Sequence, residues 1–203
     1  MIELPKTLRF ARLDEIPKNS SALARLKQTE RAKIIEGYTF QLKSQDNEEQ
    51  KNLLFNFYAE ININNTNLWN LVVALTEMLP DVSALIIGHL DSEPNYGNYL
   101  DKSKLIENLS IYKTELVSDT FLEWGIIFHN KESLTEIFIS DSKYIKFWGV
   151  DIDSFRKIMS DFGLCQIDDL EFIDEYPKVR EALRLFDNSV TDTNDLINKL
   201  KEM

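Results

Sequence analysis

The feature that most restricts the fold is the segment 82–90, VSALIIGHL, which is apolar on both faces of an extended chain. A strand of this kind is stable inside a sheet that is covered on each side, so we place it there. The residues before it form a unit with it, because Leu53–Ile63 reads as a strand and Thr66 can cap a helix that ends before Pro80. This order permits a βαβ crossover and leaves open whether the two strands are neighbours. The apolar residues of that helix are Leu68, Trp69, Val72, Leu75 and Leu79.

The stretch 121–148 reads as three antiparallel strands, FLEWGIIF, SLTEIFI and KYIKFW, joined by the turns HNKE and SDS. Asp151 is a good N-cap for a helix that ends at Gly163. Two shorter helices are predicted, one beginning near Asp101 after the loop DSEPNYGNY and one opened by Thr191 or Asp192. One more apolar piece, LEFI, precedes the acidic turn DEYP.

The amino-terminal segment is different in composition. Leu8–Ile16 can form a short extended piece, and Asn19 or Ser20 can cap a helix that runs to about Ile35, with Gly37 as its stop. This helix would expose a row of basic side chains, namely Arg25, Lys27, Arg31 and Lys33.

These elements predict an α+β fold with a mixed, largely antiparallel β-sheet, a βαβ-like first half, a three-stranded meander and packing helices. With no internal repeat and no linker between two cores, residues 1–203 are expected to form a single domain. Residues 1–50 are expected to be its N-terminal helical arm or layer.

Charge is distributed unevenly along the chain. Residues 44–203 carry 29 acidic and 14 basic side chains, residues 1–43 carry 9 basic and 5 acidic ones, and the net charge is −11. Such a field repels nucleic acids and anionic membranes and attracts basic proteins. No apolar run approaches the roughly 20 residues that span a bilayer, and the amino terminus lacks a secretory leader, so a cytoplasmic protein is expected. The single Cys165 excludes an internal disulfide.

Cofactor and catalytic motifs are missing from the sequence. There is no GxGxxG, GxxxxGK[ST], GxSxG or HExxH, and one Cys with His89 and His129 supplies no zinc-ligand spacing. Asp151 and Asp153 resemble the start of a calcium loop but lack its glycine and its closing glutamate, so helix capping explains them. We therefore expect no metal and no cofactor.

Glu123 and Glu136 are the best enzyme-like pair, because each interrupts an otherwise apolar strand. Adjacent antiparallel strands could bring the two carboxylates to one face, as in glycoside hydrolysis, whereas a slip of one residue would separate them. The alternative is that both are structural and pair with Lys143, Lys146 or Arg156. Trp69, Trp124 and Trp148 lie among aliphatic residues and are interpreted as core.

Two groups of residues are typical of a protein-recognition surface. Tyrosines beside carboxylates on a protruding loop supply contact area with few rotatable bonds, and a cluster of carboxylates after residue 167 could face a basic partner. A plain surface loop and a solvated acidic turn are the competing interpretations. The candidate contact residues are Asp91, Glu93, Tyr96, Tyr99, Asp168, Asp169, Asp174 and Glu175.

In size, acidity and element order, residues 44–203 resemble the immunity proteins of bacterial toxin systems. The resemblance implies a non-enzymatic module that neutralises a basic partner, such as a nuclease toxin, by rapid and salt-sensitive association. Two alternatives stay open: a hydrolase that uses Glu123 and Glu136, and a structural or regulatory subunit that associates with copies of itself.

Overall fold

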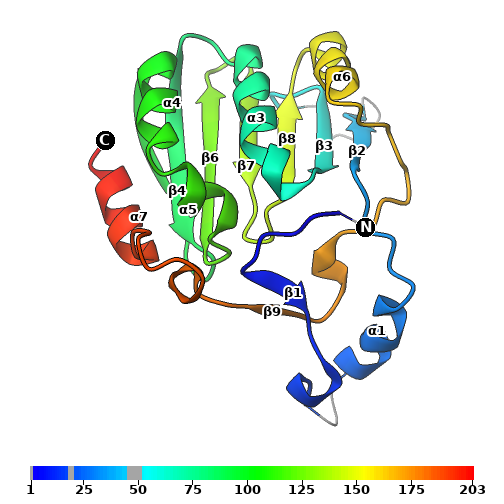
Figure 1. Ribbon diagram of the computed structural model, residues 1–203. Coiled ribbons are helices and arrows are strands. Elements are labelled where there is room, and N and C mark those ends of the chain that lie inside the picture. The colour runs from blue at the N-terminus through cyan, green and yellow to red at the C-terminus, as the bar shows by residue number, and fades with distance from the viewer. Residues whose placement is uncertain (1, 18–20, 45–51) are drawn as a thin grey trace.

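The computed structural model describes residues 2–17, 21–44 and 52–203, and within them it has an α+β fold built on one seven-stranded antiparallel sheet. The strand order is β2-β3-β8-β7-β6-β4-β5, and a second sheet of two strands, β1 and β9, lies below it in Figure 1. The expected α+β class is therefore confirmed, and every pairing inside the large sheet is antiparallel.

The strands are β1 (Leu8–Phe10), β2 (Gly37–Leu42), β3 (Phe57–Asn62), β4 (Val82–His89), β5 (Asn95–Asp101), β6 (Leu122–His129), β7 (Leu134–Ile139), β8 (Ile145–Gly149) and β9 (Lys178–Arg180). The helices are α1 (Ala22–Thr29), α3 (Asn65–Leu75), α4 (Lys102–Ser110), α5 (Lys113–Ser118), α6 (Ile152–Asp161) and α7 (Thr193–Lys201). Short 3₁₀ turns occur at Leu13–Glu15, Thr76–Met78, Ile173–Glu175 and Leu183–Leu185.

The predicted strand–helix–strand unit is present as β3, α3 and β4. Because β3 and β4 are joined through the antiparallel strands β8, β7 and β6, they run in the same direction but are not neighbours. The predicted meander β6-β7-β8 fills the space between them. The strand–helix–strand unit therefore has its two strands separated by the meander, which occupies the centre of the sheet.

Helices α3 to α6 lie on one face of the sheet (Figure 1). Helix α3 presents Leu68, Leu71, Val72 and Leu75 to that face, because residues spaced by three and four share one side of a helix. The helix begins after Asn64, two residues earlier than the predicted cap Thr66. Trp69 stacks on Trp124 with 6.0 Å between the ring centres, so the main core lies between the helices and this face.

The other face of the sheet has no helix over it among the residues that the structure describes. Strand β4 lies inside the sheet as predicted, and Ala84 and Ile86 are buried on the second face, but side chains of neighbouring strands cover them. Phe138 and Leu134 of β7 are the half-buried side chains in that cluster. The expectation of a full layer on each side of β4 was therefore wrong.

The boundaries of the amino-terminal segment also differ from the prediction. Helix α1 ends at Thr29 instead of continuing to Ile35, and Gly37 opens an edge strand of the large sheet. The predicted caps Asn19 and Ser20 lie outside the described residues. The separate layer therefore ends before Gly37, and residues 1–50 are not all an arm.

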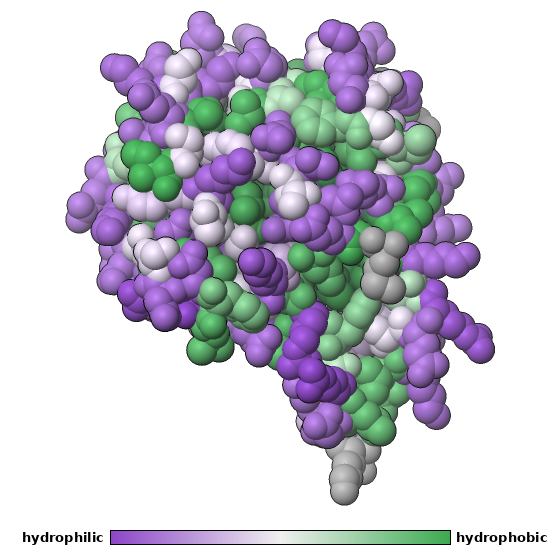
Figure 2. All heavy atoms as spheres, in the orientation of Figure 1, coloured by the Kyte–Doolittle hydropathy of each residue, from purple (hydrophilic) through white to green (hydrophobic). Residues whose placement is uncertain are grey.

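This amino-terminal layer forms the projection at the bottom of the molecule, where Figure 2 shows hydrophobic side chains gathered. An apolar cavity of about 460 Å³ is lined there by Leu13, Asp14, Ile16 and Leu23. Strand β1 pairs with β9, which joins this layer to the carboxy-terminal part of the chain.

The remaining helix ends agree closely with the sequence. Asp101, Asp151 and Asp192 each accept a hydrogen bond from a backbone N–H of the first turn of α4, α6 and α7. Gly163 follows α6 with a positive φ of 69°, which favours glycine. The apolar piece LEFI packs as a loop against Tyr144, and its last residue opens a 3₁₀ turn.

Candidate functional site

The face of the large sheet that no described helix covers carries aromatic and charged side chains, of which Tyr96 and Tyr99 are exposed and the others half-buried. We call it the open face. Successive side chains of a strand point to opposite faces of the sheet. The strand register therefore shows which residues share the open face and which point toward the helices. The open face consists of Tyr58, Glu60, Tyr96, Tyr99, Glu123, Glu136, Phe138, Lys146 and Trp148.

Two aromatic rings of the open face are neighbours on β3 and β8. Tyr58 lies opposite Trp148, and their ring centres are 4.9 Å apart with the planes inclined by 39°. Trp148 in turn lies opposite Glu136 on β7. A shallow hollow of about 220 Å³ adjoins the first pair. Its lining residues are Gln41, Leu42, Lys43, Leu53, Phe55, Tyr58 and Trp148.

Trp148 is a correction to the sequence analysis. Trp69 and Trp124 are buried as predicted, but Trp148 is half-buried on the open face. The strand Ile145–Gly149 alternates, so Ile145 and Phe147 fill the core while Lys146 and Trp148 point the other way. This alternation could have predicted that Trp148 shares a face with Lys146, but the many apolar residues of the segment favoured a buried position.

The charges of the open face are mainly negative. Glu60, Glu123 and Glu136 are accompanied by one cation, Lys146, whose Nζ lies 5.5 Å from the centre of the Tyr144 ring. Burial raises the pKa of Glu123, and Lys146 partly opposes that shift. Burial alone raises the pKa of Glu136 to about 7.

The predicted contact residues Tyr96 and Tyr99 lie on the edge strand β5, not on a loop. They pair with Ile86 and Ala84 and are 61% and 49% exposed. The Tyr99 hydroxyl donates to the backbone O of His129 at 2.9 Å and accepts from its N–H at 3.0 Å. The glycine and asparagines of NYGNY led to the loop prediction, and pairing with β4 outweighs their low strand propensity.

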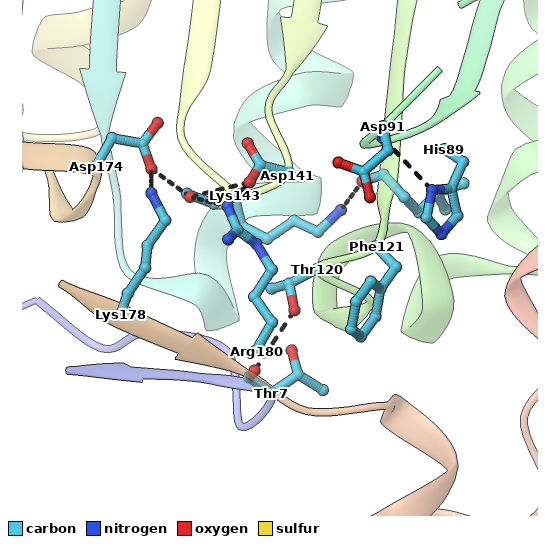
Figure 3. A network of polar contacts seen from close by, with 12 residues as sticks. Thr7, His89, Asp91, Thr120, Phe121, Asp141, Lys143, Asp174, Lys178 and Arg180 are labelled. Carbon is cyan, nitrogen blue, oxygen red and sulfur yellow. Dashed lines mark hydrogen bonds and ion pairs between the residues drawn. The ribbon is translucent and has the colours of Figure 1, made fainter. Parts of the chain in front are cut away.

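Asp91 and Glu93 are exposed in the loop between β4 and β5. The Asp91 N–H lies 3.4 Å from His89 Nδ1, and the His89 ring stacks on Phe121 with 6.0 Å between ring centres (Figure 3). This loop leads directly into β5, so Asp91 and Glu93 form a group with Tyr96 and Tyr99 along the chain, and Asp91 faces Arg180 at the lower end of the sheet (Figure 3).

The other four predicted contact residues do not join that group. Asp168 and Asp169 lie in an exposed turn next to Gln166, which forms a bridge with Tyr38 of β2, at the opposite edge of the sheet. With strands about 4.8 Å apart, the two edges are separated by roughly 29 Å. The eight residues therefore form no continuous patch.

Asp174 and Glu175 have partners inside the protein. Asp174 forms an ion pair with Lys178 and accepts a hydrogen bond from the Ser142 hydroxyl (Figure 3). Glu175 Oε1 accepts from the Phe172 N–H at 2.9 Å and caps its own turn. Both carboxylates are thus used to hold the segment 172–178 in place.

A network of polar contacts closes the lower end of the sheet (Figure 3). Arg180 of β9 forms an ion pair with Asp141 in the turn between β7 and β8. Lys143 in the same turn is buried, has a positive φ of 64°, and donates from Nζ to the backbone O of Leu122 at 2.6 Å. Burial lowers the pKa of Lys143 to about 7, opposed by Asp119 and Glu123. None of the hollows described here is lined by Lys143.

Glu123 and Glu136 share the open face but are not close together. Glu136 pairs with Ile127, four residues along β6 from Glu123, which corresponds to about 13 Å. Carboxylate pairs of glycoside hydrolases are about 5 to 9.5 Å apart. The register therefore does not supply the geometry that the hydrolase interpretation needs.

Among the described ranges, no group of three or more His, Cys, Asp or Glu side chains has an arrangement that could hold a metal ion. In the same ranges no helix combines the length and the apolar character needed to cross a bilayer. Comparison with protein-family models, with curated proteins and with solved structures finds no match for this chain.

Proposed function

We propose that this chain is a non-enzymatic protein-binding module that neutralises a basic partner protein, in the manner of an immunity protein. The observation that carries the proposal is the open face, on which exposed and half-buried aromatic rings lie among carboxylates and over which no described helix lies. Tyrosine and tryptophan are the residue types that contribute most to protein interfaces, because they bury large areas and lose few rotamers.

The charge of the face supports a basic partner. Three glutamates and one lysine lie on it, and Glu93 and Asp91 add negative charge in the loop between β4 and β5, where Arg180 partly offsets Asp91. A chain with a net charge of −11 attracts such a partner over a distance and increases the rate of encounter. Binding through this face is therefore expected to weaken as salt is added.

The width of the face is sufficient for a protein interface. From β3 to β5 it spans six strands, or about 24 Å at about 4.8 Å per strand. An ordinary interface buries about 800 Å² on each partner, which a surface of this width can supply together with the adjoining loops.

The test is site-specific photo-crosslinking in a lysate of the native cell prepared at low salt. A photoreactive phenylalanine replaces Tyr58 or Tyr96 on the open face, and Glu107 on α4 or Lys157 on α6 as matched exposed controls. We expect one basic protein to be crosslinked from the open-face positions only. Expression of that protein alone should impair growth, and coexpression of this chain should restore it.

Crosslinking from the helix positions alone, or capture of an acidic protein, would contradict the proposal. Crosslinking of the chain to a second copy of itself would instead favour the self-associating subunit. Sedimentation at low and high salt distinguishes that outcome independently.

A further inference from the structure

Glu136 occupies the middle of the open face and is surrounded by apolar and aromatic side chains. It lies opposite Trp148 on β8 and opposite Ile127 on β6, and Phe138 is the next residue of β7 on the same face. Tyr96 lies on the same face three strands away on β5, and its pKa is raised by burial and, to a smaller extent, by Glu136 and Glu93. Gly125, which is opposite Phe138, leaves space for the Phe138 ring, whose Cδ2 lies 3.3 Å from the position of a β-carbon at that glycine.

This carboxylate has no partner within the described ranges. No hydrogen bond and no ion pair to Glu136 is formed there, although Glu123, Glu60 and Tyr58 are all influenced by neighbouring polar groups. The nearest cation of the same face, Lys146, is diagonal to Glu136 across β7 and β8. Its Nζ lies over the Tyr144 ring and interacts with Glu123, so it is directed away from Glu136.

A half-buried carboxylate without a protein donor is less stable when ionised than a fully solvated one, because burial removes part of its water and no protein group replaces it. A cation that donates hydrogen bonds would restore the lost interactions. The ring of Trp148, opposite the carboxylate on β8, adds attraction for a cation at its face. A planar guanidinium matches both features, since it binds a carboxylate with two parallel hydrogen bonds and stacks on aromatic rings.

We propose that Glu136 and Trp148 form a subsite that receives one arginine side chain of the partner protein. This inference rests on the proposed function, because it names the chemistry by which the open face recognises a basic partner. The occupant is an arginine of another protein; the n-butylammonium arm of the test separates a lysine, and the crosslinking described above separates a second copy of this chain.

The experiment uses the full chain and n-butylguanidinium as the probe. Trp148 is half-buried while Trp69 and Trp124 are buried, so the side-chain N–H signal of Trp148 in a nitrogen-15 NMR spectrum reports on the subsite. We expect a saturable shift of this signal at about pH 8, a much smaller effect of n-butylammonium, and none with the neutral analogue n-butylurea. Glu136→Gln should weaken binding at least tenfold, whereas Glu132→Gln, in the exposed turn before β7, should leave it unchanged.

Lowering the pH to about 5 should also weaken binding at least tenfold, since Glu136 is then protonated. The other titratable groups that face the subsite are Lys146, Glu123 and Tyr96, and the pH effect should disappear in Glu136→Gln. An equal response to n-butylurea, or a shift that survives Glu136→Gln, would overturn the subsite.

The subsite and the proposed function can fail separately. If the crosslinks of the open face identify a basic partner but the guanidinium probe does not bind, the subsite is wrong and the docking function stands. If the probe binds and no partner is crosslinked, the docking function is wrong and only the affinity of Glu136 for a guanidinium group stands. A response to n-butylammonium as strong as to n-butylguanidinium would reject arginine in favour of lysine.

Discussion

Asp141, in the turn between β7 and β8, forms an ion pair with Arg180 of β9, and so connects the centre of the large sheet to the small sheet below it. Both side chains are largely buried, with 14% and 20% of their surfaces exposed. Arg180 Nε is buried without a hydrogen-bond partner, and burial lowers the pKa of Arg180. The ion pair therefore links the two sheets, and Asp91 and Glu123 also favour the charged form of Arg180.

Removing one member of this pair should destabilise the protein. Arg180→Gln leaves the Asp141 carboxylate buried without its cation, so we expect the free energy of unfolding to fall by about 2–4 kcal/mol. Urea unfolding followed by circular dichroism measures the loss. Arg184→Gln is the matched control, because Arg184 and Asp192 are 56% and 42% exposed and 3.9 Å apart, and it should cost less than about 0.5 kcal/mol. Equal losses in the two variants would contradict this role of the Asp141–Arg180 pair.

Glu136 should make the stability of the protein depend on pH. Its pKa is about 7 in the folded state and 4.5 in the unfolded reference, so the folded state binds the proton more tightly. This contribution therefore decreases the free energy of unfolding as the pH rises from about 4.5 to about 7. Glu136→Gln removes the penalty and should stabilise the protein at pH 8 by on the order of 1–2 kcal/mol, allowing for partial exposure, with little effect at pH 4.5. Urea midpoints of Glu136→Gln and of Glu132→Gln at both pH values test this; a stabilisation that is the same at both would refute it.

The strands and helices that could be predicted are those in which pattern and propensity agree. The meander β6-β7-β8 and the capped helices α4, α6 and α7 follow from alternation and from Asp101, Asp151 and Asp192. Strands β2 and β5 were missed, because GYTFQL follows a helical pattern and NYGNY contains turn residues. Both are edge strands, in which pairing to one neighbour fixes the conformation that local sequence leaves open.

The candidate site was predictable only in part. Tyr96 and Tyr99 were identified as exposed, and Glu136 was identified as an interruption in an apolar strand. Their assembly with Trp148 depends on strand order and register, which bring β8 and β5 to either side of β7 and β6. A sequence without aligned relatives contains no direct record of such pairings between distant segments.

Gly125 should be required for the packing of the open face. A β-carbon at this position would lie 2.5 Å from the Ile137 backbone O, which belongs to the sheet and cannot move aside, and close to the Phe138 ring. We expect Gly125→Ala to lower the free energy of unfolding by about 2–3 kcal/mol. Gly97→Ala is the matched control in a strand, since its β-carbon would meet no atom closer than 3.4 Å. Thermal unfolding compares the two, and a Gly125→Ala variant as stable as Gly97→Ala would disprove the close approach.

Lys143 should give a pH dependence of a different kind from Glu136. Burial lowers its folded-state pKa to about 7, against 10.5 for the free side chain, so between these values the unfolded state binds the proton and the folded state does not. This contribution makes the free energy of unfolding rise as the pH climbs from about 7 to about 10.5.

Lys143→Met keeps a β-carbon and a long side chain at the positive φ of 64° but removes the amine and its hydrogen bond to the Leu122 backbone O. The free energy of unfolding of the variant minus that of the unaltered protein should be largest below pH 7. It should decrease by on the order of 2–4 kcal/mol between pH 6 and pH 10. Taking the difference at each pH cancels the groups that both proteins share. Asp119 and Glu123, which face Lys143, are the exceptions because their own titration responds to the amine.

The exposed Lys131, in the turn between β6 and β7, provides the control Lys131→Met, whose effect should not vary with pH. Urea unfolding at pH 6, 8 and 10 gives the three differences for each variant. A Lys143→Met difference that is constant across this range would mean that the amine keeps its ordinary protonation in the folded state. The turn would then have to admit water to Nζ, in conflict with its 4% exposure.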